Sequence, residues 1–205
     1  MQRNTASGKF FVIEGLDGSG QSTQANLLKE FFNKKGFQTV LTKEPTIDSE
    51  AGKQIRQILD EKERISPTDL QKLFANDRKA HLENLILPAL AEGKIVISDR
   101  YFFSSFAYGA SDGIDLDWLI KTNDEFLLPD LTFILKVSPE ICIQRIEHRG
   151  IGKTLFEKRE KLAKVWETYK ILPNRFENVY MVDGEKTKEE VFSQIENIVR
   201  SEQNI

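Results

Sequence analysis

Glycines and a hydroxyl residue near the start of the chain are spaced as in a loop that binds phosphate groups. Residues 15–22 read Gly-Leu-Asp-Gly-Ser-Gly-Gln-Ser, whereas the Walker A pattern asks for Gly, four free positions, Gly, Lys, and Ser or Thr. Glycines let backbone amides approach phosphate oxygens closely, and a hydroxyl such as that of Ser22 can bind Mg²⁺. The segment therefore predicts a site for a nucleoside triphosphate.

Gln21 stands where the pattern places lysine. Lysine offers a positive charge to the β- and γ-phosphates, whereas glutamine offers only a neutral donor on a shorter side chain. The lost charge-assisted hydrogen bond is worth about 1.5–3 kcal/mol. If that bond acts mainly in the transition state, its loss costs on the order of 10²–10³ in rate. Nucleotide binding is expected to survive better than turnover, unless another cation fills the place.

Strand-like and helix-like segments alternate along the chain and must position this loop. Residues 10–14 are predicted to be a buried strand, and residues 21–35 a helix that ends at Gly36. Further strands are predicted at 39–42, 95–97, 131–137 and 179–182, and further helices from Ser66 to about Glu92, after Ser138, from Phe156 and over 188–200. Pro88 is expected to bend or divide the second helix. The alternation predicts a three-layer α/β/α fold with a five-stranded parallel sheet and helices on both faces.

Ligands of such sheets bind beyond the carboxyl ends of the strands. Asp17, Glu44, Asp99 and Arg100 fall at those ends and are the first candidates for chemistry.

Composition narrows the class of protein. The 205 residues are expected to form one domain, 1–205, with a flexible tail over 1–8, and the net charge of −3 does not indicate a nucleic-acid partner. No apolar run approaches the ~20 residues that span a membrane. A single cysteine, Cys142, fits a reducing, cytoplasmic location and is expected in the core. His81 and His148 lack metal-ligand spacing and are predicted to be partly exposed.

Phe74 and Arg78 are four residues apart on a predicted helix and so share a face. An aromatic ring beside a guanidinium can grip a planar base, because the ring stacks while the arginine hydrogen-bonds the edge. The alternative is a core aromatic residue next to a surface cation.

Several segments together resemble the thymidylate kinase family, in the family's order from Lys9 to Val199. They are Gly15–Gly20 with Ser22-Thr23-Gln24, Lys43-Glu44-Pro45, Leu73–Arg78, Asp99-Arg100-Tyr101, Ser104–Tyr108 and Pro129–Thr132. The resemblance is closest to the bacterial and archaeal branch. It implies a P-loop NTPase fold, transfer of the γ-phosphoryl of ATP to dTMP with Mg²⁺, and a homodimer.

The resemblance also implies roles for single residues. Asp17 would hold the 3′-hydroxyl of the deoxyribose near the acceptor phosphate, which Arg100 would bind. Phe74 would stack on thymine and Arg78 would hydrogen-bond its edge. The implied dTMP set is completed by Lys43, by Ser105 at the base and by Tyr108, which would crowd the position of a 2′-hydroxyl.

The ATP and metal sets follow from the same resemblance. The residues implied to hold the ATP phosphates are Gly15, Gly18, Ser19, Gly20, Gln21, Ser22 and Thr23. Ser22 and Asp99 would serve the metal.

Residues 145–159 resemble the family's lid, which closes over the phosphates. Bacterial relatives carry arginines just before the Phe156 position, where this chain has Lys153-Thr154-Leu155. Arg149 or Lys153 is therefore expected to supply the missing charge, in a catalytic set with Asp17, Arg100 and Gln21. Two other departures are Lys43 in place of arginine and Gly109 where many relatives have glutamine.

Two alternatives stay open at this point. The chain could phosphorylate another deoxynucleoside monophosphate, such as dUMP. It could also be a nucleotide-binding protein whose catalysis is weakened by Gln21.

A dimer interface could use Leu82, Leu85, Ile86 and Leu90, which are equally good core residues.

Overall fold

The computed structural model of the chain describes residues 1–148 and 155–203. Its centre is a parallel sheet of five strands in the order β3-β4-β2-β6-β7. The strands are β2 (Lys9–Gly15), β3 (Thr39–Lys43), β4 (Ile95–Asp99), β6 (Leu131–Lys136) and β7 (Val179–Asp183). The predicted five-stranded parallel sheet is confirmed.

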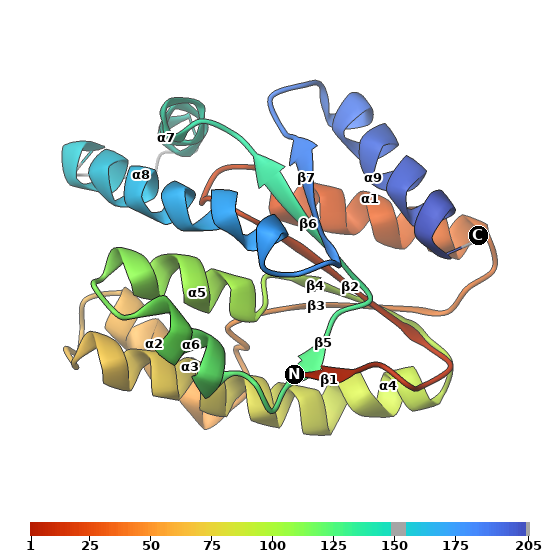
Figure 1. Ribbon diagram of the computed structural model, residues 1–205, viewed down its shortest axis with the longest axis horizontal. Coiled ribbons are helices and arrows are strands. Elements are labelled where there is room, and N and C mark those ends of the chain that lie inside the picture. The colour runs from red at the N-terminus through yellow and green to blue at the C-terminus, as the bar shows by residue number, and fades with distance from the viewer. Residues whose placement is uncertain (149–154, 204–205) are drawn as a thin grey trace.

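Helices cover both faces of this sheet, as predicted (Figure 1). On one face lie α1 (Gln21–Lys34) and α9 (Lys188–Gln203). On the other lie α4 (Leu87–Ala91) and α5 (Phe102–Ser111), with α3 (Pro67–His81) and α8 (Leu155–Ile171) packed against α5. The short helix α7 (Pro139–Glu147) contacts α8, and the 3₁₀ turn η2 (Leu172–Asn174) follows α8.

The helix predicted from Ser66 to Glu92 is divided. Ser66 caps α3 by accepting a hydrogen bond from the Asp69 amide at 3.1 Å. A π-helical turn, η1 (Leu82–Ile86), then connects α3 to α4. Pro88 lies in the first turn of α4. Because proline has no amide hydrogen and crowds the preceding turn, an unbroken α-helix cannot run through this position, whereas the first turn of a new helix tolerates it.

Several elements were not predicted. They are α2 (Glu50–Leu59), α5, α6 (Leu116–Thr122) and a small parallel pair between β1 (Gln2–Arg3) and β5 (Leu127–Leu128). The segment predicted as a flexible tail therefore makes contacts with the rest of the chain. Besides the pairing of β1 with β5, Asn4 Nδ2 donates to Asp130 Oδ2 at 2.7 Å.

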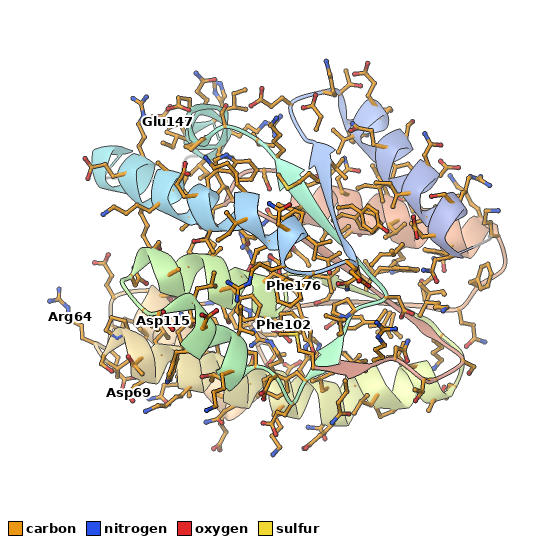
Figure 2. All side chains as sticks on the ribbon, in the orientation of Figure 1. Arg64, Asp69, Phe102, Asp115, Glu147 and Phe176 are labelled. Atoms are coloured by element: carbon orange, nitrogen blue, oxygen red, sulfur yellow. The ribbon has the colours of Figure 1, made fainter. Side chains whose placement is uncertain are left out.

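The core lies between the sheet and its helices. Phe102, Phe103 and Phe106 of α5 are fully buried, and the rings of Phe103 and Phe106 contact the partly buried Phe176. Figure 2 shows Phe102 in the interior, whereas Arg64 and Asp69 point outward. Cys142 is buried as expected.

Other predictions about single side chains had mixed outcomes. The prediction for His81 was wrong: the side chain is buried, because Thr42 and Glu44 bind both ring nitrogens. Leu82, Ile86 and Leu90 are core residues, whereas Leu85 is 39% exposed. Within the described ranges, no helix is both long and apolar enough to cross a membrane.

Candidate active site

The glycine-rich loop connects β2 to α1. Gly18 and Gly20 adopt positive φ angles of 88° and 106°, which glycine tolerates best. A Cβ on Gly18 would lie 2.6 Å from the backbone oxygen of Cys142, so the loop sits directly against α7. The loop backbone is therefore fixed both by its own conformation and by a neighbouring helix.

Gln21 turns back into this loop. Its Nε2 donates a hydrogen bond to the Gly15 carbonyl at 2.7 Å, and the residue is only 6% exposed. Arg100 Nη1 donates to the same carbonyl at 3.2 Å. The glutamine thus ties the start of the loop to the start of α1, and its amide contributes no charge to the space in front of the loop.

Oxygen donors suited to a divalent cation meet where β4 ends beside α1. Ser22 Oγ hydrogen-bonds Asp99 Oδ2, which also accepts from Lys43 Nζ at 2.8 Å. Asp99 Oδ1 is buried and has no hydrogen-bond partner among the described residues. Mg²⁺ is usually held by one or two carboxylates together with substrate phosphates and water. Ser22 and Asp99 fit that requirement, and the described residues contain no cluster of three His, Cys, Asp or Glu that would form a complete metal cage.

A cavity of about 180 Å³ brings together most of the predicted acceptor-side residues. Its walls come from the loop after β2, from α3, from the end of β4 and from α5. The predicted residues that line it are Asp17, Phe74, Arg78, Arg100, Ser105 and Tyr108. We name this space the acceptor cavity.

A larger cavity, of about 750 Å³, lies beside β3 and is lined by Ser22, Lys43 and Asp99. It shares Pro45 with the acceptor cavity. The greater volume does not make it the substrate site, because it contains neither the Phe74–Arg78 pair nor Arg100.

Arg78 is almost fully buried and held from three sides. Its Nε donates to Glu44 Oε2 at 2.9 Å, Nη1 donates to Asn123 Oδ1, and Nη2 donates to Ser105 Oγ at 3.1 Å. The guanidinium also lies over the Tyr101 ring, 5.2 Å from its centroid. Five N–H groups and three hydrogen bonds leave donors available for a ligand. Arg78 is therefore a fixed, charged donor in the wall of the acceptor cavity.

Arg100 and Asp17 face each other across the mouth of the cavity. Arg100 Nη2 donates to Asp17 Oδ1 at 2.7 Å, while the Asp17 side chain stays 61% exposed. The guanidinium also lies over the ring of Tyr108, whose hydroxyl accepts a hydrogen bond from the Asp17 amide. Arg100 has a φ of 75°, unusual for a residue with a side chain and typical of strained functional positions.

Glu14 is a buried carboxylate under this site that the sequence analysis did not single out. Burial raises the pKa of Glu14, and the positive charge of Arg100 and hydrogen bonds from Ser104, Tyr101 and Tyr169 oppose that rise. The available signal was a charged residue inside an otherwise apolar strand, immediately before Gly15.

Two other cavity-lining residues were also missed, Gln71 and Lys161, whereas Glu44, a candidate from the sequence, does line the acceptor cavity. Lys161 of α8 forms a salt bridge with Asp112, which follows α5, at 2.9 Å. Gln71 lies three residues before Phe74 on α3, so helical spacing could have identified it.

The predicted lid cations Arg149 and Lys153 lie outside the described residues. Arg145, just before them on α7, donates to the Ser19 carbonyl and to the Gly184 carbonyl, each at 3.2 Å. One cation from the predicted lid range therefore lies directly beside the glycine-rich loop.

Comparison with known proteins agrees with this arrangement. The family model described as thymidylate kinase matches residues 13–195. A probable thymidylate kinase of Pyrococcus horikoshii is 44% identical over 201 residues, covering 95% of this chain and 97% of the relative. One from Thermococcus onnurineus is 45% identical over 202 residues, covering 94% and 98%. A thymidylate kinase of Caldicellulosiruptor saccharolyticus is 36% identical over 198 residues, covering 94% and 96%. With its loop, its acceptor cavity and these relatives in agreement, the chain belongs to the thymidylate kinase family.

Proposed function

We propose that the chain transfers the γ-phosphoryl group of ATP to dTMP, giving dTDP and ADP. The observation that carries this proposal is the acceptor cavity, where an aromatic ring, a buried arginine and a second arginine at the mouth converge from separate segments. Family membership supports the same reaction.

Within the acceptor cavity, each side chain is proposed to position one part of dTMP. Phe74 stacks on the pyrimidine, and the free donors of Arg78 face a carbonyl of its edge, with Ser105 beside them. Arg100 binds the 5′-phosphate and Asp17 holds the 3′-hydroxyl. Tyr108 narrows the sugar region and so favours deoxyribose.

On the ATP side, the phosphates are proposed to lie on the amides of the loop from Gly15 to Gly20 and at the start of α1, with Ser22 and Thr23. Lys43 Nζ binds Asp99 beside the start of α1, and Arg100 Nη1 binds the Gly15 carbonyl at the start of the loop. Phosphoryl transfer needs positioning and charge neutralisation more than covalent chemistry from the protein, and these residues supply both.

Mg²⁺ is proposed at Ser22 and Asp99, where it would neutralise charge on the transferred phosphoryl group. Lys43 Nζ occupies the same carboxylate, so it must share Asp99 or move when the ion binds.

Turnover is proposed to be slower than in a chain with the loop lysine, because Gln21 carries no charge and its Nε2 is bound to the Gly15 carbonyl. Arg149 and Lys153 remain our proposed substitutes for that charge. A cytoplasmic homodimer is also proposed; light scattering on the purified protein tests the dimer.

A coupled assay of ADP release tests the main proposal, with ATP and Mg²⁺ and with dTMP, dUMP and dCMP in parallel. We expect the highest kcat/KM with dTMP. A preference for dUMP would assign the chain to another monophosphate. Stabilisation by dTMP and ATP without turnover would make it a nucleotide-binding protein.

A further inference from the structure

Glu14 makes a set of contacts that all lead to the segment carrying Arg100. Its Oε1 accepts the backbone amides of Tyr101 at 2.8 Å and Ser104 at 3.1 Å. Its Oε2 accepts the Ser104 hydroxyl at 2.6 Å and the Tyr169 hydroxyl at 2.9 Å. All four partners are donors, which is the environment that suits an ionised carboxylate.

Ser104 connects this carboxylate to Arg100. The Ser104 hydroxyl donates to Glu14 and accepts a hydrogen bond from Arg100 Nη1 at 2.9 Å. The same guanidinium then reaches Asp17 through Nη2. A chain of hydrogen bonds therefore runs from the end of β2, through the first turn of α5, to the mouth of the acceptor cavity.

The backbone at Arg100 needs such support. A residue with a side chain at a φ of 75° keeps that conformation only where its surroundings determine it. The Arg100 amide donates to the Ile13 carbonyl at 2.9 Å, and the Arg100 carbonyl accepts from Ser98 Oγ at 2.7 Å. The amides of Tyr101 and Ser104, which follow, both donate to Glu14. Adjacent residues of one strand thus fix both sides of the strained residue.

The contact with Tyr169 extends the chain to another element. Tyr169 is fully buried near the end of α8, which packs along α5 (Figure 1). Glu14 therefore joins β2, α5 and α8 at one point under Arg100.

We propose that Glu14 is a positioning residue for phosphate binding, which acts by holding Arg100 through Ser104. The inference rests on the proposed function, in which Arg100 binds the acceptor phosphate. It goes beyond that function because it assigns the buried carboxylate a measurable effect on one part of the substrate and none on the base.

Binding of dTMP and of thymidine, which lacks the phosphate, tests this inference in calorimetric titrations. In the Glu14→Gln protein we expect dTMP affinity to fall by about tenfold or more, with thymidine affinity kept within about twofold. Ser104→Ala should show the same selective loss while leaving the carboxylate in place. The double variant should lose little more than either single variant, since both act on one chain of contacts.

Asp130→Asn is the matched control. Asp130 is also a mostly buried carboxylate that accepts a backbone amide of β2, from Phe10 at 2.8 Å, but it lies at the opposite end of the strand. This variant should keep the natural ratio of dTMP to thymidine affinity.

The outcomes separate the two proposals. If the natural protein does not prefer dTMP over thymidine, the proposed role of Arg100 is wrong and the inference fails with it. If the natural protein shows the preference and both Glu14→Gln and Ser104→Ala retain it, only the positioning role is wrong. If Glu14→Gln does not fold, Ser104→Ala decides alone.

Discussion

At position 21 the phosphate loop carries an amide with one of its two N–H donors already used. The hydrogen bond from Gln21 to Gly15 closes the loop on itself, and the buried side chain has little freedom to reach outward. In the proposed reaction, electrostatic stabilisation of the transferred phosphoryl group would then come from Mg²⁺, backbone amides and cations on other elements. The loop thus keeps the backbone that binds phosphate but lacks the charge of the usual lysine. A single substitution at position 21 can measure the contribution of that charge.

We expect Gln21→Lys to raise kcat by at least about tenfold, since a loop lysine contributes mainly in the transition state. The KM for dTMP should not change, because the acceptor cavity does not include position 21. Steady-state assays of ADP release give both constants. Gln21→Met, which has neither charge nor donor, is the control and should not raise kcat. An unchanged kcat in Gln21→Lys would mean that the charge is already supplied elsewhere.

Arg78 and Glu44 form a buried ion pair. Both residues are expected to affect stability, but only Arg78 is expected to bind dTMP. Arg78→Met leaves Glu44, which is 3% exposed, without its guanidinium partner, and breaking a buried pair from one side typically costs about 3–5 kcal/mol. Urea unfolding should show a loss of that size, and calorimetry should show weaker dTMP binding. Adding Glu44→Gln should recover part of the stability but none of the dTMP affinity. Recovery of both would mean that Arg78 serves the fold alone.

At the scale of elements, the contact between the phosphate loop and α7 is measurable through its glycines. Gly18 and Gly36 have nearly the same φ, 88° and 87°. A Cβ at position 18 would meet Cys142, whereas a Cβ at position 36 would have no atom of the described residues within 4 Å. Substitution by alanine at either position should lower the free energy of unfolding by about 1–2 kcal/mol, because of the left-handed backbone conformation alone. Gly18→Ala should lower the free energy of unfolding more than Gly36→Ala does, which urea unfolding measures. Gly18→Ala should also weaken ATP binding, which a titration with ATP measures. Equal losses in both variants would show that the loop tolerates movement of α7.

The elements also differ in how well sequence predicts them. The helix spacing of Phe74 and Arg78 was sufficient to place both on one face of α3, and the cavity confirms that they line one space. The long-range partners of Arg78 could not be derived from spacing, because Glu44 and Asn123 lie 34 and 45 residues away. Helix α5 was missed because it is rich in aromatic residues and contains Gly109, a composition with low helix propensity.

The reason that α5 forms is tertiary packing. A Cβ on Gly109 would lie 2.8 Å from Leu119 Cδ2, so the glycine is what allows α6 to approach α5. The phenylalanines of α5 are buried between the sheet and α8. Packing of this kind outweighs local propensity and has no signature in a short stretch of sequence.

At the scale of the whole molecule, the parallel sheet explains why distant segments meet. Strands β2 and β4 are neighbours, with Ile13 paired to Asp99, so the glycine-rich loop and Arg100 must emerge side by side. This convergence could be predicted from the alternation of strands and helices. The orientation of the Gln21 side chain could not be predicted, because the sequence pattern allows it to point outward, as a lysine would, or inward to the Gly15 carbonyl.

The shared sheet edge predicts that both substrates stabilise one cooperative unit. A ligand at 100 times its Kd adds about 2.7 kcal/mol to the free energy of unfolding. For a chain of this size that corresponds to a rise of roughly 5–10 °C in Tm. We therefore expect calorimetry to show a single unfolding transition that moves upward as a whole with dTMP, with ATP and Mg²⁺, and further with both.

Omission of Mg²⁺ should reduce the shift produced by ATP and leave that of dTMP unchanged, because Ser22 and Asp99 lie outside the walls of the acceptor cavity. The same concentration of dCMP is the control for nonspecific effects of a nucleotide. Two transitions, of which dTMP moves only one, would contradict the single domain. That result would mean that the helices around the acceptor cavity unfold independently of the sheet, even though α5 is packed between that sheet and α8.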